Sequence, residues 1–142
     1  MERRKFIKNV AGTAVAGGIL TGPIAKTMAS KKEKSKKEKE VIAHYVLFWL
    51  KDDLTEQEVN DFTGFFEELK AIPNIKSLHY GPPAKTHQRD VVDNSFSYNL
   101  LVYFDTMEDI DTYENHPIHL AAIDKYSKNW AKVVVHDSVI KV

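Results

Sequence analysis

The residues of this sequence best suited to chemistry are Tyr113, His116 and His119, which lie on either side of Pro117. Proline lacks an N–H group and disfavours the helical conformation in the residue before it, so the spacing predicts one helix ending near His116. Proline is favoured at the first position of a helix, so a second helix is predicted to begin at Pro117. The partial positive charge of that helix N-terminus would favour a neutral His119 imidazole. A neutral imidazole near the Tyr113 hydroxyl could act as a proton-transfer pair; alternatively, these rings cap the helix ends and fill a groove.

A metal site is a further interpretation of the histidines. It would use His44, His116 and His119, with His79 as an additional ligand, because imidazole binds zinc, copper and nickel well. However, His116 and His119 straddle the proline break, so their rings need not converge, and no acidic residue lies at the usual ligand spacing beside them. The absence of cysteine also excludes thiolate ligands and thiol nucleophiles. We therefore rank the metal site last and expect neither a metal nor another cofactor.

Charge is distributed unevenly along a chain whose formal net charge is zero. Residues 41–142 hold 9 of the 20 basic residues, 16 of the 20 acidic residues and all 6 histidines. Contacts to phosphate depend on lysine and arginine, so an acidic domain is poorly suited to nucleic acid. We therefore expect no nucleic-acid partner.

Residues 1–29 have the organisation of an export signal. The basic segment Arg3-Arg4-Lys5-Phe6-Ile7-Lys8 precedes a weakly apolar run from Val10 to Ala25, which is too short and too rich in glycine for a comfortable membrane span. The basic segment resembles a bacterial twin-arginine (Tat) signal, which implies export of a folded protein to the periplasm by the Tat machinery. Thr27-Met28-Ala29 is a plausible cleavage site that would leave Ser30 as the N-terminus. Alternatively, an uncleaved signal tethers the domain to the membrane.

The segment after the signal, residues 30–41, is predicted to be a charged, disordered linker. Residues 30–40 contain no apolar side chain, so they cannot bury surface to offset the entropy of ordering. The folded domain is therefore predicted to span residues 42–142.

The hydrophobic pattern of this domain predicts the order strand, helix, strand, strand, helix, strand. This order is the α+β, ferredoxin-like split βαβ arrangement, with a four-stranded antiparallel sheet. The strands are predicted at residues 43–50, 75–81, 96–104 and 133–140. The helices are predicted from the Thr55-x-x-Glu58 capping box to Ile72, and from Thr106 to Asn129 with the break at Pro117.

The first strand predicts that both faces of the sheet are covered. His44 and Phe48 point to one face while Tyr45 and Trp49 point to the other, so neither face is polar. The helices cover one face, and no further segment of the domain remains to cover the second. We therefore expect a homodimer in which two sheets pack face to face as a closed, dimeric α/β barrel.

Together these features resemble the stress-responsive A/B barrel (Dabb) family over residues 43–140. The shared features are His44 in an apolar first strand, Ile72-Pro73, Gly81, Phe104-Asp105 and Tyr113-x-x-His116-Pro117-x-His119. The resemblance implies a dimeric α/β barrel. Many family members are stress-induced proteins without a known reaction, so the resemblance alone does not imply one here.

A plant cyclase of this family, which closes a polyketide without a cofactor, is similar over the same motif. Its catalytic tyrosine and histidine fall on Tyr113 and His119, and its first-strand histidine falls on His44. A histidine of its third strand falls on Tyr98, so the resemblance implies a pocket wall that differs here.

Two functions are expected from these observations. The first is a stress-associated barrel that binds a small apolar or aromatic molecule without chemistry, through His116, Tyr98, Phe48 and Trp49.

The alternative is a cofactor-independent lyase, cyclase or isomerase. His119 would be the general base, Tyr113 would orient it or donate a hydrogen bond to a substrate carbonyl, and His44 would be an auxiliary polar group.

Overall fold

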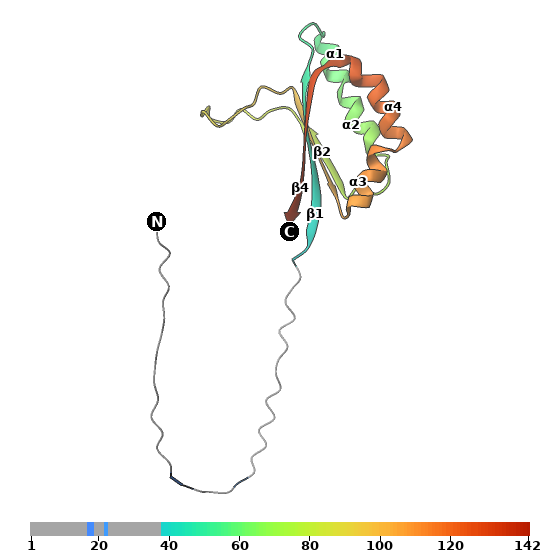
Figure 1. Ribbon diagram of the computed structural model, residues 1–142. Coiled ribbons are helices and arrows are strands. Elements are labelled where there is room, and N and C mark those ends of the chain that lie inside the picture. The colour runs from blue at the N-terminus through green and yellow to red at the C-terminus, as the bar shows by residue number, and fades with distance from the viewer. Residues whose placement is uncertain (1–16, 19–21, 23–37) are drawn as a thin grey trace, which may run out of the picture. The chain divides into compact units, whose positions relative to one another are not determined.

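The computed structural model describes residues 17, 18, 22 and 38–142 of the chain (Figure 1). The predicted export signal, apart from residues 17, 18 and 22, and linker residues 30–37 lie outside the described residues. The described elements follow the predicted order. They are β1 (Glu40–Leu50), α1 (Glu56–Asp61), α2 (Thr63–Leu69), β2 (Ser77–Gly81), β3 (Tyr98–Phe104), α3 (Met107–Glu114), α4 (Pro117–Tyr126), the 3₁₀ turn η1 (Ser127–Asn129) and β4 (Trp130–Lys141).

The four strands form one antiparallel sheet in the order β2-β3-β1-β4. This is the predicted α+β, ferredoxin-like arrangement, with the two long strands β1 and β4 paired from Glu40–Lys141 to Leu50–Trp130. β1 begins at Glu40 rather than at residue 43, because its first residues pair with the end of β4. The register places Asp137 of β4 directly opposite His44 of β1.

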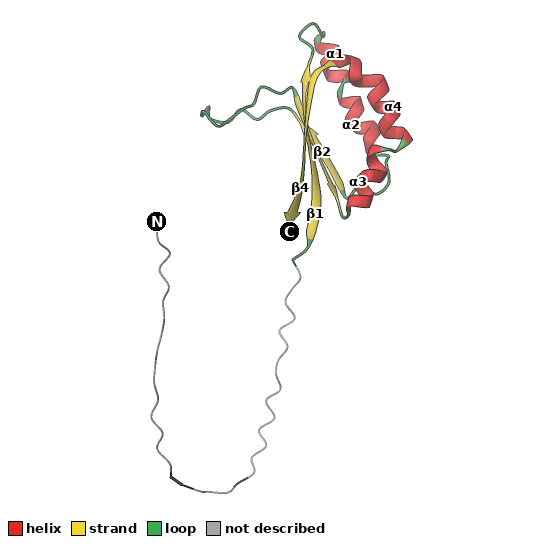
Figure 2. Cartoon of the chain, viewed as in Figure 1, coloured by secondary structure: helices red, strands yellow, loops and turns green. Residues whose placement is uncertain are grey.

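The helices pack on one face of this sheet (Figure 2). Alternate residues of β1 and β3 point into that layer and are buried, as are the apolar residues of α2. The core contains Ile42, Val46, Phe48, Leu50, Phe62, Phe65, Phe66, Leu69, Ile72, Leu100, Val102, Phe104, Ile110, Tyr113 and Ala122. Aromatic rings fill its centre, where the Phe48 ring lies 5.5–5.7 Å from four other aromatic rings.

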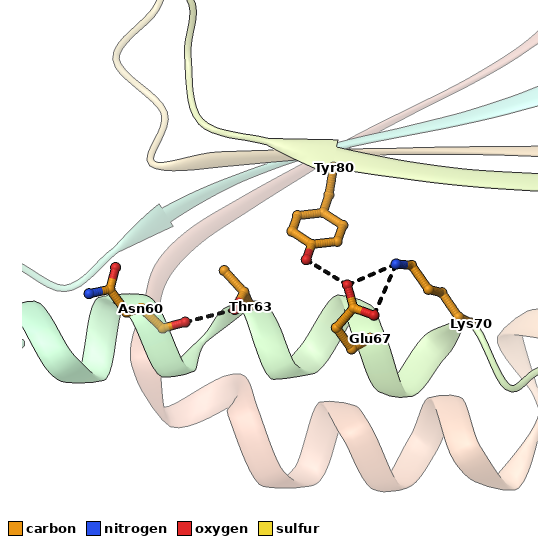
Figure 3. A network of polar contacts seen from close by, with 5 residues as sticks. All are labelled: Asn60, Thr63, Glu67, Lys70 and Tyr80. Carbon is orange, nitrogen blue, oxygen red and sulfur yellow. Dashed lines mark hydrogen bonds and ion pairs between the residues drawn. The ribbon is translucent and has the colours of Figure 1, made fainter.

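The first helical segment is divided into α1 and α2, where the sequence predicts one helix. Thr55 caps α1 in the predicted capping box with Glu58. Near the division, the Thr63 hydroxyl donates to the Asn60 carbonyl at 2.8 Å (Figure 3). The Phe65 N–H bonds to the Phe62 carbonyl in a tighter turn.

Glu67 of α2 connects this helical layer to strand β2. It accepts a 2.6 Å hydrogen bond from the Tyr80 hydroxyl and a 2.8 Å bond from Lys70 (Figure 3). These exposed polar contacts link α2 to strand β2 at the edge of the sheet.

The proline break is confirmed. α3 ends at Glu114, and α4 begins at Pro117 with His116 in an extended conformation as its N-cap. The Thr106 hydroxyl caps α3 by accepting from the Asp109 N–H at 3.1 Å. The break turns the chain so that the end of α3 and the first turn of α4 are close together.

The second face of the sheet carries no helix (Figure 2). Tyr45, Leu47 and Trp49 of β1, with Leu101 and Tyr103 of β3, lie on this uncovered face and are each partly exposed. The connection of residues 82–97 extends from the sheet on the side away from the helices (Figure 1). Within the part of the chain that the structure describes, no helix is both long and apolar enough to cross a membrane.

Candidate acid–base site

Tyr113, near the end of α3, is the centre of the candidate site. It is fully buried, and its ring lies 5.8 Å from the His44 ring and 4.6 Å from the His119 ring. Its hydroxyl is buried without a hydrogen-bond partner among the described residues. Burial raises the pKa of Tyr113 well above its usual value, and the charge of Glu114 raises it further. The hydroxyl therefore stays protonated at neutral pH and has a donor proton that no described group accepts.

His119 lies in the first turn of α4, as predicted. Its Nδ1 is 3.0 Å from the backbone carbonyl oxygen of Glu114, and a carbonyl can only accept, so Nδ1 carries the proton. In the neutral ring Nε2 is then the acceptor. Burial lowers the pKa of His119 below its usual value; the bond to Glu114 opposes this shift, and His44 contributes to it. His119 is therefore a neutral base with a fixed tautomer.

His44 of β1 is hydrogen-bonded to Asp137 of β4. The ring is only 6 % exposed, and its Nδ1 lies 2.6 Å from Oδ1 of Asp137. Because a carboxylate accepts, His44 donates from Nδ1. Asp137 thus fixes the orientation of the ring, in the manner of an acid that orients a catalytic histidine.

A pocket of about 300 Å³ lies between α3 and β4 beside this cluster. It is lined by Ile42, Met107, Ile110, Asp111, Glu114, Asp137, Ser138 and Val139. Glu114 connects it to the pair, since its side chain lines the pocket while its backbone carbonyl binds His119. The pocket thus offers a small molecule an apolar wall and an acidic rim.

The structure brings His44, Tyr113 and His119 together, as the catalytic prediction requires. The four residues predicted to contact a ligand are placed differently. His116 accepts a 3.1 Å hydrogen bond from the Ile118 N–H and so caps α4. This contact corresponds to the capping alternative for that ring.

Phe48 and Tyr98 lie on the helix-covered face and pack with Phe62 and Phe66 in the aromatic core. Trp49 lies on the opposite face, where its Nε1 donates to the Ser95 hydroxyl at 3.0 Å. None of these three aromatic residues lines the pocket beside Glu114.

Two acidic residues of the site, Glu114 and Asp137, were not identified from the sequence. Asp137 interrupts an apolar strand, and this could have marked it, but only the β1–β4 register brings it opposite His44. Glu114 comes directly after Tyr113, and only the end of α3 shows that its carbonyl is free to bind His119.

The arrangement can remove a proton and stabilise the resulting oxygen charge. The Nε2 atom of His119 can accept the proton, and the Tyr113 hydroxyl can donate to a substrate oxygen. No described residue of the pair needs to change its protonation state before the reaction, because His119 is neutral and Tyr113 is protonated.

Comparison with known proteins places this chain in a family. Residues 42–140 match the model of the Stress Responsive A/B Barrel Domain, Dabb. Olivetolic acid cyclase from Cannabis sativa is 25% identical over 97 residues, which cover 68% of this chain and 93% of the cyclase.

Two solved structures share the fold. Hydroxynitrile lyase from Passiflora edulis has a TM-score of 0.62 at 18% identity, over 72% of this chain and 94% of the lyase. A dimeric ferredoxin-like protein of unknown function from Thermobifida fusca has a TM-score of 0.59 at 22% identity, over 71% of this chain and 92% of that protein. Because the family model matches residues 42–140 and the fold agrees, the chain belongs to the stress responsive A/B barrel (Dabb) family.

Proposed function

We propose that this protein is a cofactor-independent cyclase or lyase that transfers a proton on a small carbonyl compound. His119 is the general base, Tyr113 donates a hydrogen bond to the substrate oxygen, and His44, oriented by Asp137, is the auxiliary polar group. The observation that carries the proposal is the buried Tyr113 hydroxyl, unpartnered among the described groups, with its ring 4.6 Å from the neutral His119 ring.

Electrostatics support this division of roles. A base must be deprotonated to act, and the lowered pKa of His119 keeps it neutral at physiological pH. A donor to a developing oxyanion must keep its proton, and the raised pKa of Tyr113 meets that requirement. A positioned base contributes about 10²- to 10⁴-fold, so the substrate should be already activated, as a carbon acid or as a hydroxynitrile that loses cyanide.

The relatives support the reaction class. One is named a cyclase and another a hydroxynitrile lyase. The match to this chain covers more than nine tenths of the length of each. The proposal for this chain is limited to that class, because identities of 25% and 18% do not carry a substrate from one protein to another.

We further propose that the working form is a homodimer. The uncovered sheet face exposes Tyr45, Leu47 and Trp49, and a second copy is the partner that would bury the same surface on both chains. The relative from Thermobifida fusca is described as dimeric.

The test is turnover of two probes. A linear poly-β-keto thioester would give a proton of its activated carbon to His119, and an aryl hydroxynitrile such as mandelonitrile would give its hydroxyl proton to His119 as cyanide leaves and an aldehyde forms. We expect cleavage or cyclisation by the wild-type protein and a loss of about 100-fold or more in H119Q and Y113F. H87Q is the matched control, because His87 is an exposed loop residue. Equal rates in H119Q and the wild type would contradict the proposed roles.

A second candidate is a binding protein without a reaction. The pocket between α3 and β4 favours this candidate, because neither Tyr113 nor His119 is among its lining residues. A molecule could therefore bind there without contacting the acid–base pair. Native mass spectrometry of untagged protein separates the two: a tightly held small molecule that remains in H119Q indicates binding alone.

Export remains part of the proposal. Arg3 and Arg4 support a Tat signal, and cleavage after Ala29 would release a periplasmic protein beginning at Ser30. We expect the R3K/R4K double variant to stay in the cytoplasm with an uncut N-terminus. Intact mass after cell fractionation checks this, and periplasmic recovery of the double variant would contradict it.

A further inference from the structure

We propose that His44, Glu114 and Asp137 form a binding site for one divalent transition-metal ion of the zinc or manganese class. The three side chains each offer a ligand atom, and these atoms lie within 4.8 Å of one another. They come from three elements, β1, the end of α3 and β4, so the fold brings them together from distant parts of the sequence. The site stands whether or not Tyr113 and His119 catalyse a reaction.

The donor set fits such an ion. Imidazole favours zinc and iron-group metals, while carboxylates favour manganese and magnesium, so one histidine with two carboxylates suits zinc or manganese. Two ionised carboxylates also balance the charge of a divalent ion. The metal site considered from the sequence used His44, His116 and His119, but the structure uses His116 as a helix cap and places Glu114 and Asp137 beside His44.

His44 gives the site a fixed anchor. It is 6 % exposed, and its ring packs edge-on against Phe104 at 6.5 Å and Tyr113 at 5.8 Å. These contacts leave the ring little freedom, so a metal ligand at this position would be preorganised. Asp137 is half exposed and Glu114 is exposed, so both carboxylates are free to adjust around the anchor.

The required adjustment is small. Ligand atoms of a tetrahedral site with bonds of about 2.0–2.1 Å lie roughly 3.3 Å apart. The His44–Asp137 pair is now at hydrogen-bond distance, 2.6 Å, and would open by a fraction of an ångström as the ion replaces the shared proton. The ligand atoms are at most 4.8 Å apart, and rotation of the exposed carboxylates would bring them closer together.

The surroundings favour a cation. Asp111, Glu114 and Asp137 line the pocket, and none of its lining residues is basic. Among the described residues, these three acids make one ion pair, between Asp137 and His44. Two carboxylates held this close repel each other, and a bound cation relieves that repulsion.

A second observation points to a ligand at the same place. The Tyr113 hydroxyl is fully buried without a described partner, and the Tyr113 ring lies 5.8 Å from the His44 ring. A metal-bound water would supply the acceptor that this hydroxyl lacks. The pocket of about 300 Å³, which Glu114 and Asp137 line, leaves room for a water on the ion, as in zinc sites that keep three protein ligands and one open position.

Binding of the metal alone tests the proposal. Untagged protein is stripped with chelator and titrated with Zn²⁺ and with Mn²⁺ by isothermal calorimetry, and bound metal is counted by elemental analysis. We expect one ion per chain for at least one metal. E114Q and D137N should weaken binding by at least ~100-fold, because loss of a direct ligand should exceed the 10- to 100-fold cost of losing an outer partner. Both positions are exposed, so these variants should fold.

D111N is the matched control, because Asp111 lines the same pocket but is not one of the three clustered ligands. It should bind the metal within about threefold of the wild type, since it loses only long-range attraction. H44Q should lose binding as well, with circular dichroism to confirm its fold. The proposal is overturned if neither metal binds, if E114Q and D137N bind normally, or if D111N loses as much affinity as they do. These outcomes leave the turnover test of Tyr113 and His119 unaffected.

Discussion

At the scale of single residues, the candidate site depends on the burial and the hydrogen-bond partners of three polar rings. His44 is buried with an acid, His119 is half-buried with a backbone carbonyl, and Tyr113 is buried with no described partner. A buried hydroxyl without a partner costs stability, so its retention calls for a reason beyond packing. A substrate oxygen or a metal-bound water would provide that reason.

Replacing Tyr113 by phenylalanine separates stability from function. Y113F removes a hydroxyl that has no described partner, so the free energy of unfolding should be unchanged or rise by up to about 1 kcal/mol, while turnover falls about 100-fold. Y80F is the control, because it deletes the bond to Glu67 and should lower the unfolding free energy by up to about 1 kcal/mol. Urea denaturation measures both. A clear destabilisation in Y113F would show that its hydroxyl is paired in solution.

The lowered pKa of His119 predicts a pH dependence. Its folded-state pKa lies below the unfolded value of about 6.5, so protonation favours the unfolded chain. The stabilising contribution is present above pH 6.5 and is lost as the pH falls below it. Activity should likewise persist to below pH 6.5 before the base is protonated. The wild type should lose more unfolding free energy than H119Q between pH 7.5 and 5; parallel losses would contradict the lowered pKa.

At the scale of elements, the proline break is the feature that the sequence predicted best. Its two consequences, the end of α3 and the start of α4, follow from local chemistry at Pro117. The division between α1 and α2 was not predicted, because the apolar stripe continues through Phe62. The position of Asp137 opposite His44 was also not predictable, since strand register is set by pairing across the whole of β1 and β4.

The N-cap of α4 provides a prediction at this scale. His116 accepts the Ile118 N–H, so H116A should lower the unfolding free energy by about 1 kcal/mol. H116N keeps a side-chain acceptor of similar reach and should retain most of the stability. Thermal or urea unfolding compares the two variants. Equal losses in both would indicate that the ring acts by a contact other than the cap.

At the scale of the whole molecule, alternation of apolar residues was sufficient to predict the ferredoxin-like sheet with its helices on one face. Residues 43–50 alternate between two non-polar faces, and the structure covers only one of them. The interior cavity could not be predicted in the same way. Phe48 and Tyr98 were expected to contact a ligand, yet they fill the core with Phe62 and Phe66, because side-chain packing decides whether a barrel interior is open.

The dimer gives a prediction for the uncovered face. L47K places a charge at the centre of that face and should convert a wild-type dimer to a monomer, because a buried, unpaired charge is costly. L120K is the matched control: Leu120 is already 54% exposed on α4, so the same substitution should leave the dimer intact. Light scattering after gel filtration gives the mass. A monomeric wild type, or a dimeric L47K, would contradict the proposed interface.

The most direct test of the account is proton removal itself, independent of the product that follows. The measurement is the rate at which deuterium from D₂O enters the central carbon of an aryl 1,3-diketone at pH 7, followed by proton NMR. The account predicts exchange by the wild type and by H87Q at the same rate, with a loss of about 100-fold or more in H119Q. Exchange in H119Q at the wild-type rate would show that His119 is not the base.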